Sequence, residues 1–83
     1  MIATEAELYS TAEDLYIFAN YPAIKQDADA NFIPIGSKDF FRRRILNALE
    51  GYSREEPSLD DVIADEDLKS LEDALLIVSR LIA

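Results

Sequence analysis

The 83-residue chain contains no cysteine, no histidine and no tryptophan, and only two glycines. Without cysteine there is no disulfide framework, no thiol nucleophile and no zinc–thiolate site. Without histidine the chain lacks the commonest general base and the commonest metal ligand. Two isolated glycines cannot form a glycine-rich phosphate-binding loop. These absences favour a protein that is not an enzyme and that holds no metal and no cofactor.

Long apolar runs are also missing. No stretch approaches the roughly 18 apolar residues of a membrane span, and the N-terminal residues lack a basic region followed by an apolar one. We therefore expect a cytoplasmic protein that does not contact a membrane. A chain of this length forms one domain over residues 1–83 and buries only roughly 60–65% of its unfolded surface, so a partner or a second copy would add useful stability.

The spacing of apolar residues predicts an all-α fold, a small bundle of three main helices over residues 5–19, 38–50 and 66–81. Thr4 and Glu7 form a capping box for the first helix, Ser37 caps the second, and Asp65 is the expected cap of the third. A short helix is expected over residues 59–64. The predicted buried faces are Leu8, Tyr9, Ala12, Leu15, Tyr16 and Ala19 in the first helix, Phe41, Ile45, Leu46, Ala48 and Leu49 in the second, and Leu68, Leu71, Ala74, Leu75, Val78, Leu81 and Ile82 in the third.

Between the first two helices the helical pattern weakens, and only residues 22–26 are expected to form a helical turn. Pro34 restricts Ile33 to extended geometry, so the segment over residues 32–35 is predicted to be extended. It is either an edge strand or a crossing segment whose apolar side chains plug the bundle. We favour the plug, because no second strand is available to pair with it.

The triplet Asp27, Asp29 and Asn31 has the spacing of the first ligands of an EF-hand calcium loop. The rest of that pattern fails, because Phe32 stands where the loop needs glycine and Lys38 where it needs glutamate. We interpret the stretch as a solvated acidic loop without a metal.

Charge is strongly segregated along the chain, whose formal net charge is -9. The stretch around the second helix, residues 37–54, is basic, while the flanking stretches, residues 1–36 and 55–73, are acidic. This order favours internal pairing on folding and predicts a strongly negative surface around residues 55–73.

Three consecutive arginines, Arg42 to Arg44, lie in the basic helix. At about 100° per residue they point in three directions, and only Arg42 falls within the apolar stripe. We predict that Arg42 lies at the edge of the core in a structural ion pair with Asp60, Asp61 or Asp65. Arg43 and Arg44 are expected either to tether the acidic segments or to face solvent, and direct binding of nucleic acid is disfavoured because so acidic a surface repels phosphates.

The sequence therefore predicts a non-enzymatic interaction protein that binds a basic protein surface, as inhibitors, immunity proteins, antitoxins and nucleic-acid mimics do. The alternative is a structural subunit of a homo-oligomer or a larger assembly. In that case Leu76, which projects away from the apolar stripe of the last helix, is the candidate oligomer contact. The candidate partner-binding residues are Glu55, Glu56, Asp60, Asp61, Asp65, Glu66 and Asp67, with Tyr52 as an aromatic anchor.

Overall fold

The structure is a computed structural model that describes residues 2–50 and 68–82. It places four α-helices in these residues: α1 (Glu5–Ala19), α2 (Tyr21–Ala30), α3 (Lys38–Leu49) and α5 (Leu71–Ile82). No strand occurs within the described ranges, so the predicted all-α class is confirmed. The first two predicted main helices, over residues 5–19 and 38–50, agree with α1 and α3 to within one residue. The short helix predicted over residues 59–64 lies outside the described residues.

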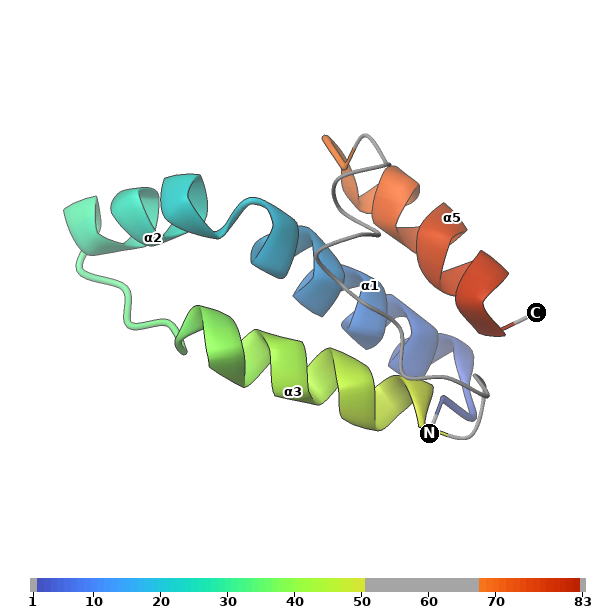
Figure 1. Ribbon diagram of the computed structural model, residues 1–83. Coiled ribbons are helices and arrows are strands. Elements are labelled where there is room, and N and C mark those ends of the chain that lie inside the picture. The colour runs from blue at the N-terminus through green and yellow to red at the C-terminus, as the bar shows by residue number, and fades with distance from the viewer. Residues whose placement is uncertain (1, 51–67, 83) are drawn as a thin grey trace.

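Helix α1 is the centre of the bundle and packs against both α3 and α5 (Figure 1). The core lies between these three helices, and Leu15, Phe18, Ile45 and Val78 are its largest fully buried side chains. A helix with neighbours on two sides buries a wide arc, which explains why the single face predicted for α1 was partly wrong. Thr11, Asp14 and Phe18 are buried although the pattern did not include them, whereas the included Tyr9 is half exposed.

The starts of α1 and α3 follow the predicted caps. The Thr4 hydroxyl accepts a hydrogen bond from the Glu7 backbone N–H at 3.2 Å, and the Ser37 hydroxyl accepts one from the Phe40 N–H at 3.1 Å. In each case a side-chain oxygen satisfies one of the backbone donors that the first helical turn leaves without a partner.

Helix α5 starts later than predicted. The three residues before Leu71 are not helical, so the prediction that this helix begins at residue 66 was wrong. The Ser70 hydroxyl caps the helix instead, because it accepts a hydrogen bond from the Asp73 N–H at 3.2 Å. The apolar period misled because Leu68 is buried without being helical. Its carbonyl instead accepts a hydrogen bond at 2.9 Å from the side-chain amide of Asn20, at the junction of α1 and α2.

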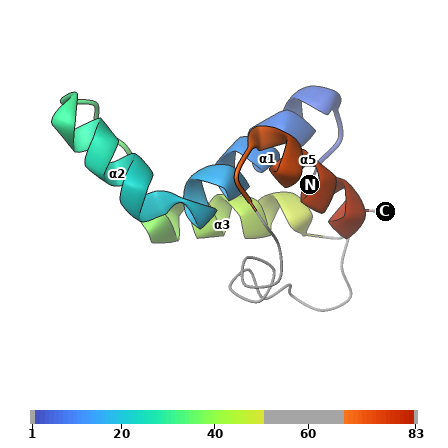
Figure 2. The same cartoon turned by 90° about the horizontal axis from the view of Figure 1, so that it is seen from above.

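Helix α2 is longer than the predicted turn and projects from the bundle as an arm (Figure 2). Ala28 is its only buried residue. Asp27 and Asp29 stand on this helix, so their interpretation as a loop was wrong. The physical reason is local: Lys25 Nζ pairs with Asp29 Oδ1 at 2.7 Å across one helical turn, and alanine favours the helix.

The arm ends in a Schellman motif. The Ile33 N–H donates to the Ala28 carbonyl at 2.8 Å and the Phe32 N–H donates to the Asp29 carbonyl at 3.2 Å. The motif requires a left-handed residue, usually glycine, and Phe32 fills that position with φ 57°. This conformation costs a residue with a side chain roughly 1–2 kcal/mol.

The same turn directs Phe32 into solvent and overturns the predicted plug. The segment that follows α2 is not helical, as expected, but Phe32 is 94% exposed and Ile33 57% exposed. Farther along, the Tyr21 hydroxyl donates to the Gly36 carbonyl at 2.7 Å, which fastens the start of α2 to the segment before α3. The connector therefore passes beside the core instead of through it.

Candidate functional site

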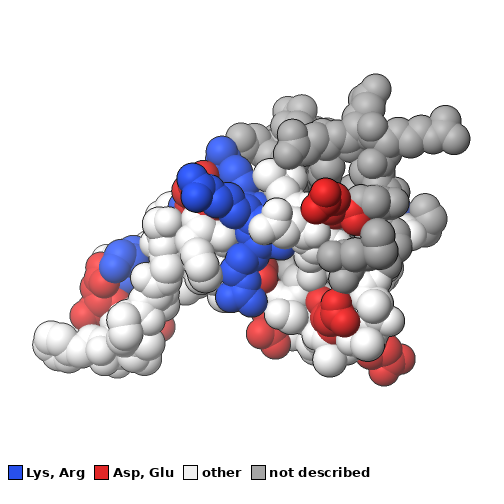
Figure 3. All heavy atoms as spheres, turned by 90° about the horizontal axis from the view of Figure 1, so that it is seen from below, with Lys and Arg blue, Asp and Glu red and all other residues white. Residues whose placement is uncertain are grey.

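The three arginines of α3 go to three different places. Arg43 pairs with Asp39 one turn earlier on its own helix, with 2.9 Å between Nε and Oδ2, and both side chains are exposed. Arg42 is half-buried, and its guanidinium carbon lies 5.3 Å from the centre of the buried Phe18 ring. Arg44 crosses to α1 and pairs with Asp14. Viewed from below, Lys and Arg side chains form a band across the middle of the molecule (Figure 3).

The pair between Asp14 and Arg44 joins the two helices, with 3.2 Å between Arg44 Nε and Asp14 Oδ2. The Asp14 side chain is 11% exposed and the Arg44 side chain 48% exposed. Burial raises the pKa of Asp14 above its ordinary value, because the charged carboxylate loses solvation. The nearby Arg44 lowers the pKa in part, and the negative charge of Glu13 raises it further. The carboxylate is therefore costly to ionise even with its cation in place.

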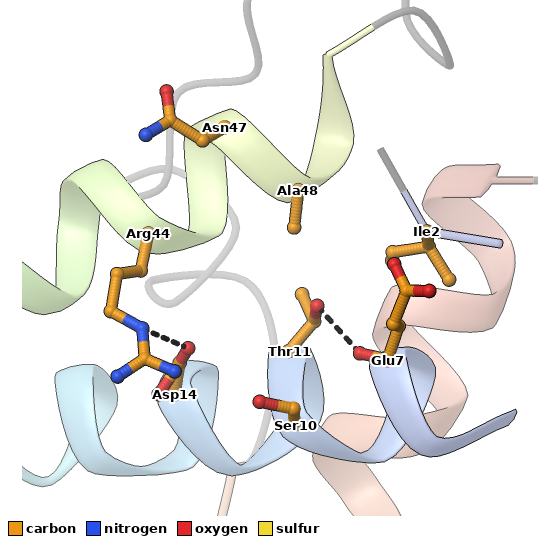
Figure 4. Close-up of a pocket in the computed structure, with 8 residues that line it drawn as sticks. All are labelled: Ile2, Glu7, Ser10, Thr11, Asp14, Arg44, Asn47 and Ala48. Atoms are coloured by element: carbon orange, nitrogen blue, oxygen red, sulfur yellow. Dashed lines mark hydrogen bonds and ion pairs between the residues drawn. The ribbon is translucent and has the colours of Figure 1, made fainter. Parts of the chain in front are cut away.

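A cavity of about 280 Å³ lies beside this pair between α1 and α3. Figure 4 shows Arg44 reaching across to Asp14 at one end of it, with Thr11 opposite Ala48 and Asn47 pointing away from α1. The Thr11 hydroxyl donates to the Glu7 carbonyl at 2.9 Å. This hydrogen bond stays within α1, so the polar link across the cavity is the ion pair of Arg44 with Asp14.

The candidate partner-binding residues named from the sequence all lie outside the described ranges. This holds for Tyr52, Glu55, Glu56, Asp60, Asp61, Asp65, Glu66 and Asp67. The ion pair predicted for Arg42 stays a prediction for the same reason, because its expected acidic partners are among them. Of the other candidates, Leu76 is described and is 64% exposed on α5.

The sequence led us to expect that Arg44 either tethers the acidic segments or faces solvent, and it pairs with Asp14 of the acidic stretch 1–36, a partner that was not named from the sequence. The exposed apolar tip of the arm was missed. The pairing of Arg44 with Asp14 has a weak signal: Asp14 lies three residues after Thr11 and four before Phe18, so all three share one side of α1. The sequence gives a clearer signal for the exposed apolar tip of the arm, Phe32 and Ile33. A run of eight uncharged residues, 30–37, follows a helix with few apolar positions, so its large side chains have little core to enter.

The described residues contain no group of three or more acidic, histidine or cysteine side chains that could hold a metal ion. None of the helices in those residues is long and apolar enough to span a bilayer. Comparison with known proteins found no matching family model, no similar curated protein and no similar solved structure.

Proposed function

We propose that the protein is a non-catalytic interaction module whose acidic segment, residues 55–67, binds a basic protein surface. The segment contains seven carboxylate side chains and no lysine or arginine. A surface of this kind attracts a cationic partner and fixes its orientation. Where the partner is a nucleic-acid-binding protein, the carboxylates would stand in the positions of phosphates.

The observation that carries the proposal is that two arginines of the basic helix α3 form ion pairs with carboxylates outside the acidic segment. Arg43 is paired with Asp39 and Arg44 with Asp14, both within the described residues. These two guanidinium groups therefore do not neutralise the acidic segment. This supports the proposal, because a carboxylate of the segment that does not pair with these two arginines can attract another molecule.

The test compares two variants of equal net charge. One reverses three carboxylates of the acidic segment to lysine: Asp60, Asp61 and Glu66. The control reverses three exposed carboxylates elsewhere, namely Glu13, Glu50 and Glu72. Each protein is immobilised, exposed to extract from its native host and eluted over a salt gradient, and the eluted proteins are identified by mass spectrometry.

We expect wild type and control to retain the same basic protein, with retention falling steeply as salt rises, and the segment variant to lose it. Equal loss in both variants would refute the proposal, because net charge alone would then explain binding. Retention by all three proteins, or retention that does not depend on salt, would refute it as well.

A second candidate function is a structural subunit of a homo-oligomer or larger assembly. The observation that favours it is the number of large apolar side chains left in solvent, among them Leu76 on α5 and Phe32 and Ile33 at the tip of the arm. Sedimentation of the wild type and of Leu76→Glu tests the contact predicted from the sequence, and Ser79→Glu, at an exposed position of the same helix, is the control.

A further inference from the structure

We propose that the cavity between α1 and α3 binds a primary ammonium group on a short alkyl chain, with Asp14 as its anionic partner. The cavity measures about 280 Å³. This is close to the lower end of the range for ligand pockets, roughly 300–1,000 Å³, so the site suits a ligand of a few carbon atoms. The proposal concerns a second site and does not depend on the acidic segment.

Asp14 is a buried carboxylate that the fold satisfies only in part. The residue is 7% exposed, and its Oδ2 lies 3.2 Å from Arg44 Nε. Within residues 2–50 and 68–82 its other oxygen, Oδ1, accepts no hydrogen bond. Most buried polar atoms in folded proteins have a partner, so this oxygen, in a residue that lines a cavity, points to a ligand. Burial also raises the pKa of Asp14, and a second cation beside it would stabilise the charged form.

Thr11 supplies a second acceptor on the same face of α1. Its hydroxyl donates to the Glu7 carbonyl at 2.9 Å, so the lone pairs of the hydroxyl oxygen are left for a donor in the cavity. Residues three apart on a helix have Cβ atoms roughly 5–6 Å apart, so one nitrogen can contact both Thr11 and Asp14. An ammonium group has three N–H donors and no acceptor, which suits these two oxygens.

The charges and the apolar surface of the cavity favour an alkylammonium over an anion. The lining contains two carboxylates, those of Glu7 and Asp14, against one guanidinium, that of Arg44, so its net charge is -1. Ile2 and Ala48 also line the cavity, and Figure 4 shows Ile2 at the end opposite Arg44. These two side chains offer apolar contacts to the methylene groups of an alkyl chain whose charged end lies at Asp14.

A primary alkylammonium is either a free amine or the side chain of a lysine in another protein. Two probes separate these sources: n-butylamine, which reproduces the lysine side chain alone, and N-acetyl-lysine methylamide, which carries that side chain on a peptide backbone. Each is titrated into the full chain, labelled with ¹⁵N, at pH 7 and constant ionic strength, and binding is read from NMR chemical shifts. Binding of both probes supports a site open to a protein lysine, and binding of n-butylamine alone supports a site for a free amine.

We expect a dissociation constant for n-butylamine in the millimolar range, because so small a ligand makes few contacts. Asp14→Asn should weaken its binding by about tenfold or more, since a hydrogen bond to a charged group is lost. Glu72→Gln, at an exposed position of α5, changes the net charge equally and should leave the constant unaltered. Arg44→Met removes the competing cation from Asp14 and should tighten binding several-fold.

Ala48→Leu tests the cavity without changing any charge. The larger side chain narrows the cavity and should weaken n-butylamine binding several-fold, whereas Ala23→Leu, at an exposed position of α2, is the matched control and should have no effect. The NMR spectrum of each variant establishes that it is folded.

Three results would overturn the inference: no binding of either amine, equal binding of n-butylamine and its uncharged analogue n-butanol, or equal affinity of wild type and Asp14→Asn for n-butylamine. None of them bears on the acidic segment, because binding of a basic partner is measured with separate variants.

Discussion

Replacing Arg44 and replacing Asp14 should have very different effects on stability, although the two residues form one ion pair. Removing one partner of a fully buried pair costs about 3–5 kcal/mol, whereas an exposed pair contributes about 0.2–1 kcal/mol. Asp14 is nearly buried and Arg44 is half exposed, so this pair lies between the two limits. Arg44→Met keeps most of the apolar stem but leaves the carboxylate without its cation. We expect it to lower the free energy of unfolding at pH 7 by about 1.5–2 kcal/mol.

Asp14→Asn should change the free energy of unfolding by less than about 0.5 kcal/mol, because it removes the cost of burying a charge together with the attraction to Arg44. The asparagine carbonyl can still accept a hydrogen bond from the arginine Nε. The double variant should lie close to Asp14→Asn, which gives a coupling energy of about 1 kcal/mol or more in a double-mutant cycle. Urea unfolding followed by circular dichroism measures all four proteins. Equal losses in the two single variants would refute the reasoning.

The pH dependence of stability tests independently whether the buried Asp14 carboxylate stabilises or destabilises the fold when it ionises. Because the folded-state pKa of Asp14 is raised, the folded protein holds this proton more tightly than the unfolded chain does. The stabilisation from this group is fully present below the unfolded-state pKa, about 3.9, and is lost as pH rises through the folded-state value. Wild type should therefore lose stability relative to Asp14→Asn as pH rises from 3 towards neutrality, which Tm measured in parallel would record. A difference that moves in the opposite direction would show that attraction to Arg44 outweighs burial.

Two further substitutions test local packing. Gly36→Ala would place a Cβ 2.5 Å from Cδ1 of Phe40, so the ring must move, and we expect a loss of about 1 kcal/mol in urea unfolding that disappears when Phe40 is also alanine. Ser70→Ala removes the hydroxyl that accepts from the Asp73 N–H and should cost about 1 kcal/mol, with a drop in Tm of roughly 4–8 °C; an unchanged Tm would mean that water satisfies this donor equally well.

The helices were predictable where the sequence contains both a cap and a stripe. Thr4 and Ser37 marked two helix starts correctly, and Phe41, Ile45 and Leu49 marked the buried face of α3. The start of α5 was not predictable from apolar spacing, because Leu68 continues the period while its backbone is not helical. Ser70 was the better guide, since a hydroxyl followed three residues later by a carboxylate is itself a capping signal.

The connector after α2 shows why it is harder to predict which side chains are buried than which residues are helical. Phe32 and Ile33 are apolar, and burial would be their expected fate if core space were available. Whether such space exists depends on how α1, α3 and α5 fill the interior together, which no local pattern contains. The Schellman turn then decides the direction of Phe32, and a phenylalanine at its left-handed position gives no sequence signal of the kind that glycine would.

The partners of the three arginines, Arg42 to Arg44, bear on both the packing of the helices and the proposed function. Helical geometry separates neighbouring residues by about 100°, so adjacent cations contact different partners: a ring, a carboxylate on the same helix and a carboxylate on α1. Of these two ion pairs, Arg44 with Asp14 joins the basic stretch to the acidic stretch of residues 1–36, whereas Arg43 with Asp39 stays within α3. Residues 51–67 hold seven carboxylates against one arginine, a net charge of -6 out of the -9 of the whole chain. Since so dense a charge opposes compaction of the chain, a cationic partner at the acidic segment should stabilise the fold as it binds, and Tm should rise with partner concentration.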